Sequence, residues 1–241
     1  GADYVQDTKI YQSFEAGVAS QGLSVQHPAP ETDFAFGSGK FTVLSPQSIS
    51  SNDNDNSVAI RLENGSNHFL FTGDAESAGE EAICNLGIDL SCDVIVPGHH
   101  GSATATTWNL LQQTVPEYAV ISCRAGNSYG HPHKDTMDKL SDMGIQVFRT
   151  DEQGTIIAVS DGNSIEWNQN PVMITHREMN PIPVHSPLPF MMIPEVLPTD
   201  PSTHPITIPR LLLRQKLKMW AIWSGSPLQE ANITEFQIVA I

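Results

Sequence analysis

Residues 94–101 read VIVPGHHG, a short apolar run that leads through a proline and a glycine into two adjacent histidines. An apolar run of this length, bounded by turn residues, is typical of a buried strand. Two other stretches have the same form. Residues 69–74 read FLFTGD and end on an aspartate, and residues 118–133 read YAVISCRAGNSYGHPH and end on a second histidine cluster. Three strand patterns therefore each lead into a loop that carries potential metal ligands.

Ligands that follow strands are held rigidly by the sheet, while the loops leave room for water and substrate. Imidazole and carboxylate together suit Zn²⁺, and also Mn²⁺ or Fe. Each feature alone has a simpler interpretation: Asp74 as an ordinary helix N-cap, His99-His100 as structural residues, and His131-Pro132-His133 as a loop without chemistry. Three such features at consecutive strand ends favour a metal or phosphate site.

The surrounding pattern predicts a mixed sheet covered by helices. A helix is expected from Asp7 or Thr8 to Gly22, and a hairpin is expected around a type I′ turn at Asn64-Gly65. Short strands are expected at Leu23–Gln26 and Phe34–Leu44, and the polar stretch Ser48–Asn56 is expected to be a surface loop. Beyond the hairpin, strands and helices alternate as far as Trp167.

The net charge of −15 lies entirely in the first part of the chain. Residues 1–168 carry 22 Asp and Glu against 7 Lys and Arg, whereas residues 169–241 carry 5 of each. Nucleic-acid affinity comes mostly from Lys and Arg neutralising phosphates, so no extended basic nucleic-acid surface is expected. A small phosphate ester held by a metal is compatible with this charge, because the metal supplies the positive charge.

The composition divides the chain at about residue 168. Residues 171–209 contain ten prolines and no helical or strand period, so residues 169–241 are expected to form a Pro-rich linker and tail with little order. No apolar run reaches the roughly 18–20 residues of a transmembrane segment. Cys84, Cys92 and Cys123 fit no zinc or redox motif, and we expect thiols that are buried or without a role, with a Cys84–Cys92 bridge as the alternative.

The order and spacing of these motifs resemble the metallo-β-lactamase-fold hydrolase domain of the competence-protein ComEC type. The resemblance covers about residues 4–167 and rests on FLFTGDAE (69–76), VIVPGHHGS (94–102), YAVIS with NSYGHPH (118–133) and FRTDEQGTI (148–156). It implies an α+β fold in which two mixed β-sheets form an αββα sandwich with flanking helices. It also implies two divalent metal ions, Zn or Mn.

By this resemblance, Asp74 would bridge both metals, His100 would bind the first and His131 the second. His99, Ser102 and His133 would be candidates for substrate contact, and either neighbouring pair of histidines could exchange roles. The HxHxDH motif of such domains, which provides four further ligands, is absent from this sequence. We expect an N-terminally incomplete domain that binds metal weakly and does not turn over as given; a natural noncatalytic homologue is the alternative.

For an intact parent the expectation is metal-dependent hydrolysis of a phosphodiester, with single-stranded DNA among the substrates considered. The Asp161-Gly162 ending with Trp167-Asn168 looks most like short secreted relatives, which suggests an extracellular or cell-surface location. Two rival functions remain open: hydrolysis of a lactam, thioester or lactone by the same metals, and a metal-free binding or scaffold module.

Overall fold

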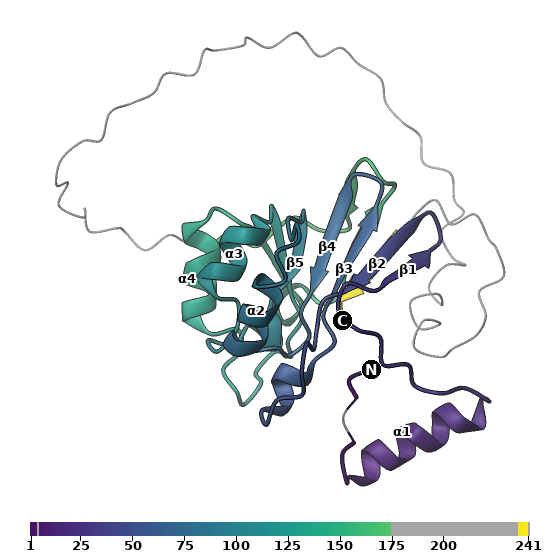
Figure 1. The fold of residues 1–241 in the computed structure, drawn as a ribbon. Helices are drawn as coiled ribbons and strands as arrows, with labels where there is room; N and C mark the ends of the chain where they lie inside the picture. The colour runs from purple at the N-terminus through teal and green to yellow at the C-terminus, as the bar shows by residue number, and fades with distance from the viewer. Residues whose placement is uncertain (4, 175–235, 241) are drawn as a thin grey trace.

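The computed structural model describes residues 1–3, 5–174 and 236–240, and its main feature is a seven-stranded mixed sheet (Figure 1). The strands lie side by side in chain order: β1 (Asp33–Phe36), β2 (Gly39–Val43), β3 (Ile60–Asn64), β4 (Asn67–Phe71), β5 (Val94–Val96), β6 (Tyr118–Ile121) and β7 (Gln146–Arg149). The first four pair antiparallel, and β4 to β7 pair parallel. The carboxyl ends of β4, β5 and β6 therefore lie at one edge.

A second, antiparallel sheet contains β8 (Ile156–Ser160) at its centre, flanked by β9 (Ile165–Trp167) and β10 (Phe236–Ala240). Residues 236–240, within the segment expected to be a tail, thus pair with β8, from Phe236 opposite Ser160 to Ala240 opposite Ile156. The Pro-rich stretch that motivated the expectation of a linker falls mostly within residues 175–235, outside the described residues.

Side-chain alternation along the parallel strands divides the core into two layers. On β4, Leu70 faces one apolar cluster and Phe69 the other, as the period of two requires. The first cluster includes residues of the three helices α2 (Ser77–Cys84), α3 (Trp108–Thr114) and α4 (Lys134–Asp142), which lie together on one side of the sheet (Figure 1). The second joins the large sheet to Ile156 and Ala158 of β8. The fold is α+β, with helices, a mixed sheet and a smaller sheet in successive layers.

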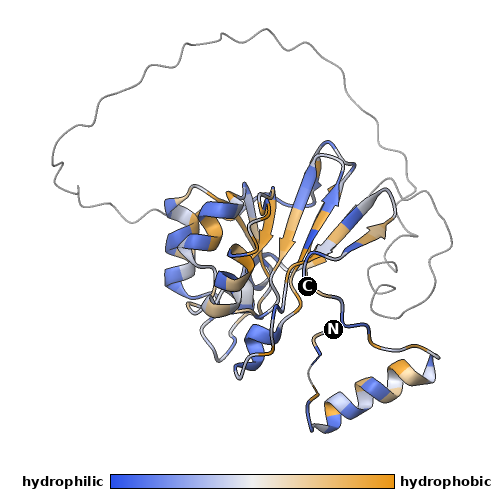
Figure 2. Ribbon diagram, viewed as in Figure 1, coloured by the Kyte–Doolittle hydropathy of each residue, from blue (hydrophilic) through white to orange (hydrophobic). Residues whose placement is uncertain are grey.

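The N-terminal helix α1 (Lys9–Ser20) begins as predicted, with Thr8 as its N-cap accepting from the Tyr11 N–H. None of its residues is buried, and it stands apart from the sheets in Figure 1. Figure 2 shows hydrophobic residues concentrated on the central strands β4 and β5. Among the helices that the structure describes, none combines the length and apolar content needed to cross a bilayer.

Two of the local predictions are wrong. The stretch Leu23–Gln26 forms no strand. The hairpin turn is centred on Gly65 and Ser66, because Asn64 pairs with Asn67. The buried Asn64 side chain donates to the Ser160 carbonyl and hydroxyl, and Ser66 N–H donates to the Gly162 carbonyl. Contacts with the loop after β8 thus displace the turn by one residue from the position its sequence favours.

All three cysteines are free. Cys84 and Cys92 are buried in the cluster under the helices. Burial, followed by nearby carboxylates, raises the pKa of Cys84 to about 11, and burial raises that of Cys92 to about 12. The expectation of buried thiols is met for Cys84 and Cys92, whereas Cys123 is only partly buried, and no Cys84–Cys92 bridge is present.

Candidate metal centre

Asp74, His100 and His131 meet at the edge where the parallel strands end. Asp74 follows β4, His100 lies in the 3₁₀ turn η2 (Gly98–Gly101) after β5, and His131 lies in the loop between β6 and α4. The Nε2 atom of His100 is 3.5 Å from Oδ1 of Asp74, and the His100 and His131 rings are 6.4 Å apart between centroids. Parallel pairing brings these side chains together, since it aligns Phe71 of β4 with Val96 of β5.

The backbone of η2 is strained. His99 and His100 have φ values of 49° and 58°, and Gly101 follows at 81°. The left-handed region costs an L-residue roughly 1–2 kcal/mol, and such conformations cluster at functional sites. A side chain at Gly101 would place Cβ 2.8 Å from Pro132 Cβ, so this turn packs directly against the loop that carries His131.

Two histidines are oriented through Nδ1. His100 Nδ1 lies 2.8 Å from the Ser122 carbonyl oxygen, which can only accept, so Nδ1 carries a proton and Nε2 is the ring nitrogen that faces Asp74. His99 Nδ1 lies 3.1 Å from Oε1 of Glu76. A carbonyl or carboxylate behind Nδ1 is the usual support for a histidine that binds metal through Nε2.

His131 occupies the centre of a group of aromatic rings. Its centroid is 5.4 Å from that of His99, 4.8 Å from that of His133 and 5.7 Å from that of Tyr129. Desolvation, followed by repulsion from His133, His99 and His100, lowers the pKa of His131, and Asp74 acts in the opposite direction. The neutral imidazole that this favours at neutral pH is the form that binds metal.

The other two residues considered for substrate contact are engaged with the protein. His133 Nδ1 accepts from the Ala103 N–H at 2.9 Å, so Nε2 carries the proton and donates to the Tyr129 carbonyl at 3.1 Å. Ser102 is only 4% exposed, and its hydroxyl lies 3.0 Å from that of Thr104. In this structure both residues brace loops of the site, and their contact with a substrate stays a prediction.

The acidic side chain that organises the centre is Glu76. Its carboxylate accepts hydrogen bonds from Asn52 at 3.0 Å, Asn54 at 3.1 Å and Thr104 at 3.0 Å, in addition to its contact with His99. Burial raises the pKa of Glu76, but these four hydrogen bonds outweigh it and the net shift is downward. Glu76 is therefore a carboxylate at neutral pH, which suits it to hold the Nδ1 proton of His99.

The stretch expected to be a surface loop is in fact a support for this carboxylate. Its 3₁₀ turn η1 (Asp53–Asn56) buries Asp55, which is 9% exposed. Asp55 Oδ1 accepts from the N–H groups of Glu76 and Gly79, and Ser57 Oγ accepts from the N–H of Asp74. The polar composition of the loop was misleading, because its side chains satisfy the start of α2 instead of solvent.

These contacts also change the interpretation of two acidic residues. Asp74 is not the helix N-cap of its simpler interpretation, since Glu76 holds that position. No sequence pattern assigned a role to Glu76. Its place two residues after Asp74 in the TGDAE segment was the available signal, but nothing local connects it with His99.

The carboxylate and imidazole groups of this site are suitable ligands for a divalent metal, but they do not enclose an ion by themselves. Asp74 and His100 have half-exposed side chains, at 45% and 54%, so the site is open to solvent. In the described part of the chain, however, no group of three or more His, Cys, Asp or Glu side chains is arranged to hold one metal ion. Oriented imidazoles beside a carboxylate fit Zn²⁺ or Mn²⁺ in chemistry, while further ligands are needed to enclose an ion.

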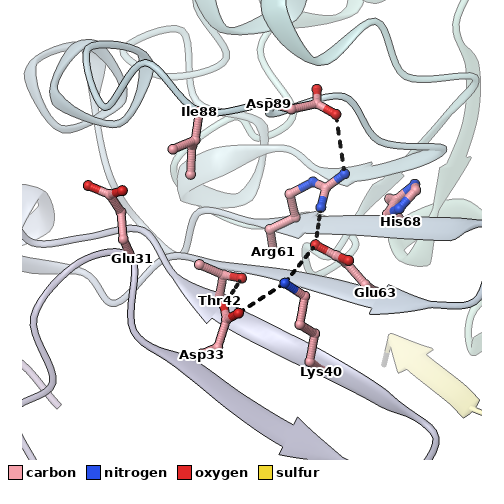
Figure 3. Close-up of a pocket in the computed structure, with 9 residues that line it drawn as sticks. All are labelled: Glu31, Asp33, Lys40, Thr42, Arg61, Glu63, His68, Ile88 and Asp89. Atoms are coloured by element: carbon pink, nitrogen blue, oxygen red, sulfur yellow. Dashed lines mark hydrogen bonds and ion pairs between the residues drawn. The ribbon is translucent and has the colours of Figure 1, made fainter.

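A separate pocket of about 400 Å³ lies toward the opposite end of β4. Figure 3 shows Asp33, Lys40, Arg61, Glu63 and Asp89 facing one another, while Glu31 points away from them. Lys40 pairs with Asp33 at 2.9 Å, and Arg61 pairs with Glu63 at 2.5 Å and Asp89 at 3.9 Å. His68, at the start of β4, also lines the pocket. Together with the 3.7 Å contact of Lys40 with Glu63, these ion pairs connect β1, β2 and β3 with the loop before β5. The pocket contains none of the candidate ligands.

The sequence is similar to bacterial proteins that are named for competence. The chain is 37% identical over 118 residues to ComE operon protein 3 of Bacillus subtilis (strain 168), a match that covers 48% of this chain and 15% of that protein. Competence protein ComA of Neisseria gonorrhoeae is 37% identical over 105 residues, covering 43% and 15%. This chain resembles competence proteins.

Recombination protein 2 of Haemophilus influenzae (strain ATCC 51907 / DSM 11121 / KW20 / Rd) is 39% identical over 102 residues, or 42% of this chain and 13% of that protein. The chain therefore matches less than a sixth of the length of each of these relatives. No family model matches the sequence.

Proposed function

We propose that this chain supplies Asp74, His100 and His131 to the two-metal centre of a metallo-β-lactamase-fold hydrolase domain that cleaves phosphodiesters. The observation that carries the proposal is the meeting of Asp74 with His100, at 3.5 Å, beside His131 at the ends of parallel strands. The similarity to competence proteins supports it, because a protein named for competence belongs to a process that handles DNA.

The chain's own residues would prepare this centre before any substrate arrives. The Ser122 carbonyl fixes the tautomer of His100, and Glu76 fixes that of His99. The Ser57 hydroxyl accepts from the Asp74 N–H and positions the turn after β4. When bound, two divalent metal ions supply a nucleophile from water at neutral pH and neutralise charge on the phosphate oxygens. Preorganised ligands lower the cost of binding those ions.

The acidic surface agrees with a small contact area for the substrate. A chain with a net charge of −15 repels a long polyanion, so attraction to phosphate would come from the metals rather than from a basic groove. The four HxHxDH ligands are absent from this sequence, and the proposal requires that they come from elsewhere in the active protein.

The test compares this chain with the longest polypeptide that its gene encodes, each with added Mn²⁺ or Zn²⁺. We expect phosphodiester hydrolysis in the longer polypeptide and its loss in Asp74→Ala. Asp142→Ala is the matched control, because Asp142 is an exposed acidic residue at the end of α4. Metal binding measured by calorimetry gives a second readout that is independent of turnover.

Other outcomes would favour the rival functions. Hydrolysis of a β-lactam, thioester or lactone without any phosphodiester activity would reject the proposed substrate class while retaining the metal centre. A longer polypeptide that binds neither Mn²⁺ nor Zn²⁺ would reject the metal centre and favour a binding or scaffold module.

A further inference from the structure

Tyr129 presents an exposed aromatic ring beside the candidate metal centre. The residue is 76% exposed, and its ring is stacked on His131 with centroids 5.7 Å apart and an angle of 25° between the planes. A single exposed aromatic residue is ordinary on a protein surface. What distinguishes Tyr129 is that one face is backed by a candidate ligand while most of the side chain remains open to solvent.

The loop that carries Tyr129 is held in place by hydrogen bonds at both ends. Asn127 donates to the Arg124 and His131 carbonyls at 2.9 and 2.6 Å, and its own Oδ1 accepts from His131 N–H at 3.0 Å. His133 Nε2 donates to the Tyr129 carbonyl. A ring on a braced loop loses little conformational freedom when a ligand packs on it, which is the condition for a useful binding surface.

The same loop carries an exposed cation. Arg124 is exposed and forms no ion pair within the described residues. Lys9 and Lys139 likewise form none there, whereas Lys40, Arg61, Lys134 and Arg149 each pair with at least one carboxylate. The backbone carbonyl of Arg124 accepts from Asn127, the same side chain that donates to the His131 carbonyl, so Arg124 belongs to the loop segment that carries Tyr129 and His131. An aromatic platform together with a nearby guanidinium is the combination that proteins use to hold single-stranded nucleic acid.

We propose that Tyr129 determines specificity at this site by stacking on the nucleobase next to the phosphate under attack, with Arg124 contacting an adjoining phosphate. This inference rests on the proposed phosphodiesterase function and extends it. It requires only one or two nucleotides of contact, which is compatible with the absence of a broad basic surface. It also separates the substrate from lactams, thioesters and small alkyl diesters, which offer no base to stack.

The experiment measures binding and hydrolysis of two oligonucleotides that have identical phosphate backbones, one with bases and one abasic. Binding is followed by fluorescence anisotropy at low salt, and hydrolysis is followed in the longest polypeptide that the gene encodes, with Mn²⁺. Tyr129→Ala should weaken binding of the base-containing strand and lower its kcat/KM, each by roughly 5- to 100-fold. The abasic strand should be unaffected, and Tyr129→Phe should retain most of the wild-type preference.

Phe34→Ala is the matched control, because Phe34 is an exposed aromatic residue on β1, three strands from β4 in the sheet. Arg124→Gln should weaken the binding of both strands equally, since the proposed partner of Arg124 is a phosphate. The role of Tyr129 would be overturned if Tyr129→Ala weakened binding of both strands equally or of neither strand. It would also be overturned if the wild type bound no strand detectably. Absence of hydrolysis of both strands in every variant would instead reject the proposed function, so the two failures are distinguishable.

Discussion

The Nδ1 atom of His99 lies 3.1 Å from Oε1 of Glu76, and this contact joins the turn after β5 to the start of α2. The same carboxylate is held by two asparagines and a threonine. A carboxylate with four donors is fixed in position, so the imidazole that it holds is fixed as well. The centre is therefore supported by residues that have no place among its candidate ligands.

Glu76→Ala should lower the free energy of unfolding by about 1–3 kcal/mol, because four donors, three of them partly buried, lose their acceptor. Glu76→Gln should cost less, since the amide keeps one acceptor oxygen. Urea denaturation checks both values, with Glu81→Ala as the control on the exposed side of α2. A Glu76→Ala protein as stable as this control would contradict the described network.

Gly101→Ala should be more damaging than Gly126→Ala, although both glycines have positive φ values, of 81° and 65°. The added methyl group at Gly101 would lie 2.8 Å from Pro132 Cβ, whereas at Gly126 it meets nothing within 4 Å. Both substitutions carry the backbone penalty of roughly 1–2 kcal/mol. The clash should add about 1–3 kcal/mol at Gly101 alone. Thermal and urea unfolding of the two variants, measured side by side, give the difference directly.

His131→Ala and His133→Ala should separate metal binding from stability. Loss of His131 should lower the affinity for Zn²⁺ on the order of tenfold or more, with a small effect on unfolding. Loss of His133 removes two hydrogen bonds to backbone groups and should cost about 1–2 kcal/mol in unfolding free energy. Calorimetric titration and urea denaturation measure the two quantities, with exposed His27→Ala as the control. Identical behaviour of the two variants would reject this division of roles.

The buried Glu80 should make stability depend on pH. Its carboxylate accepts from the N–H groups of Thr106 and Thr107 at 2.6 and 2.7 Å. Desolvation, the largest effect, raises the pKa of Glu80 above its usual value despite these hydrogen bonds. The folded state therefore binds this proton more tightly than the unfolded chain. The contribution of Glu80 to the free energy of unfolding is therefore fully present below the pKa that this residue has in the unfolded chain. It is lost as pH rises through the pKa of Glu80 in the folded protein.

The comparison for Glu80 is with Glu80→Gln, whose side chain does not titrate. As pH rises from the acidic range toward neutrality, the wild type should lose unfolding free energy relative to this variant. Urea denaturation at several pH values measures the trend. The prediction would be contradicted if the difference in unfolding free energy between the two proteins stayed constant with pH, or if the wild type gained stability relative to Glu80→Gln as pH rises. Either result would show that the hydrogen bonds to Glu80 offset the effect of burial on its pKa.

The sequence by itself determined the order of strands and helices from β3 to β7 and the positions of Asp74, His100 and His131 after three strands. It could do so because hydrophobic period and turn residues act over a few neighbours, and because parallel strands end at a common edge. It could not assign Glu76, Asp55 or the shifted turn at Gly65. Those depend on hydrogen bonds between residues about 20 to 100 positions apart, and only the tertiary structure decides which distant polar groups meet, because no local pattern records where a buried donor finds its acceptor.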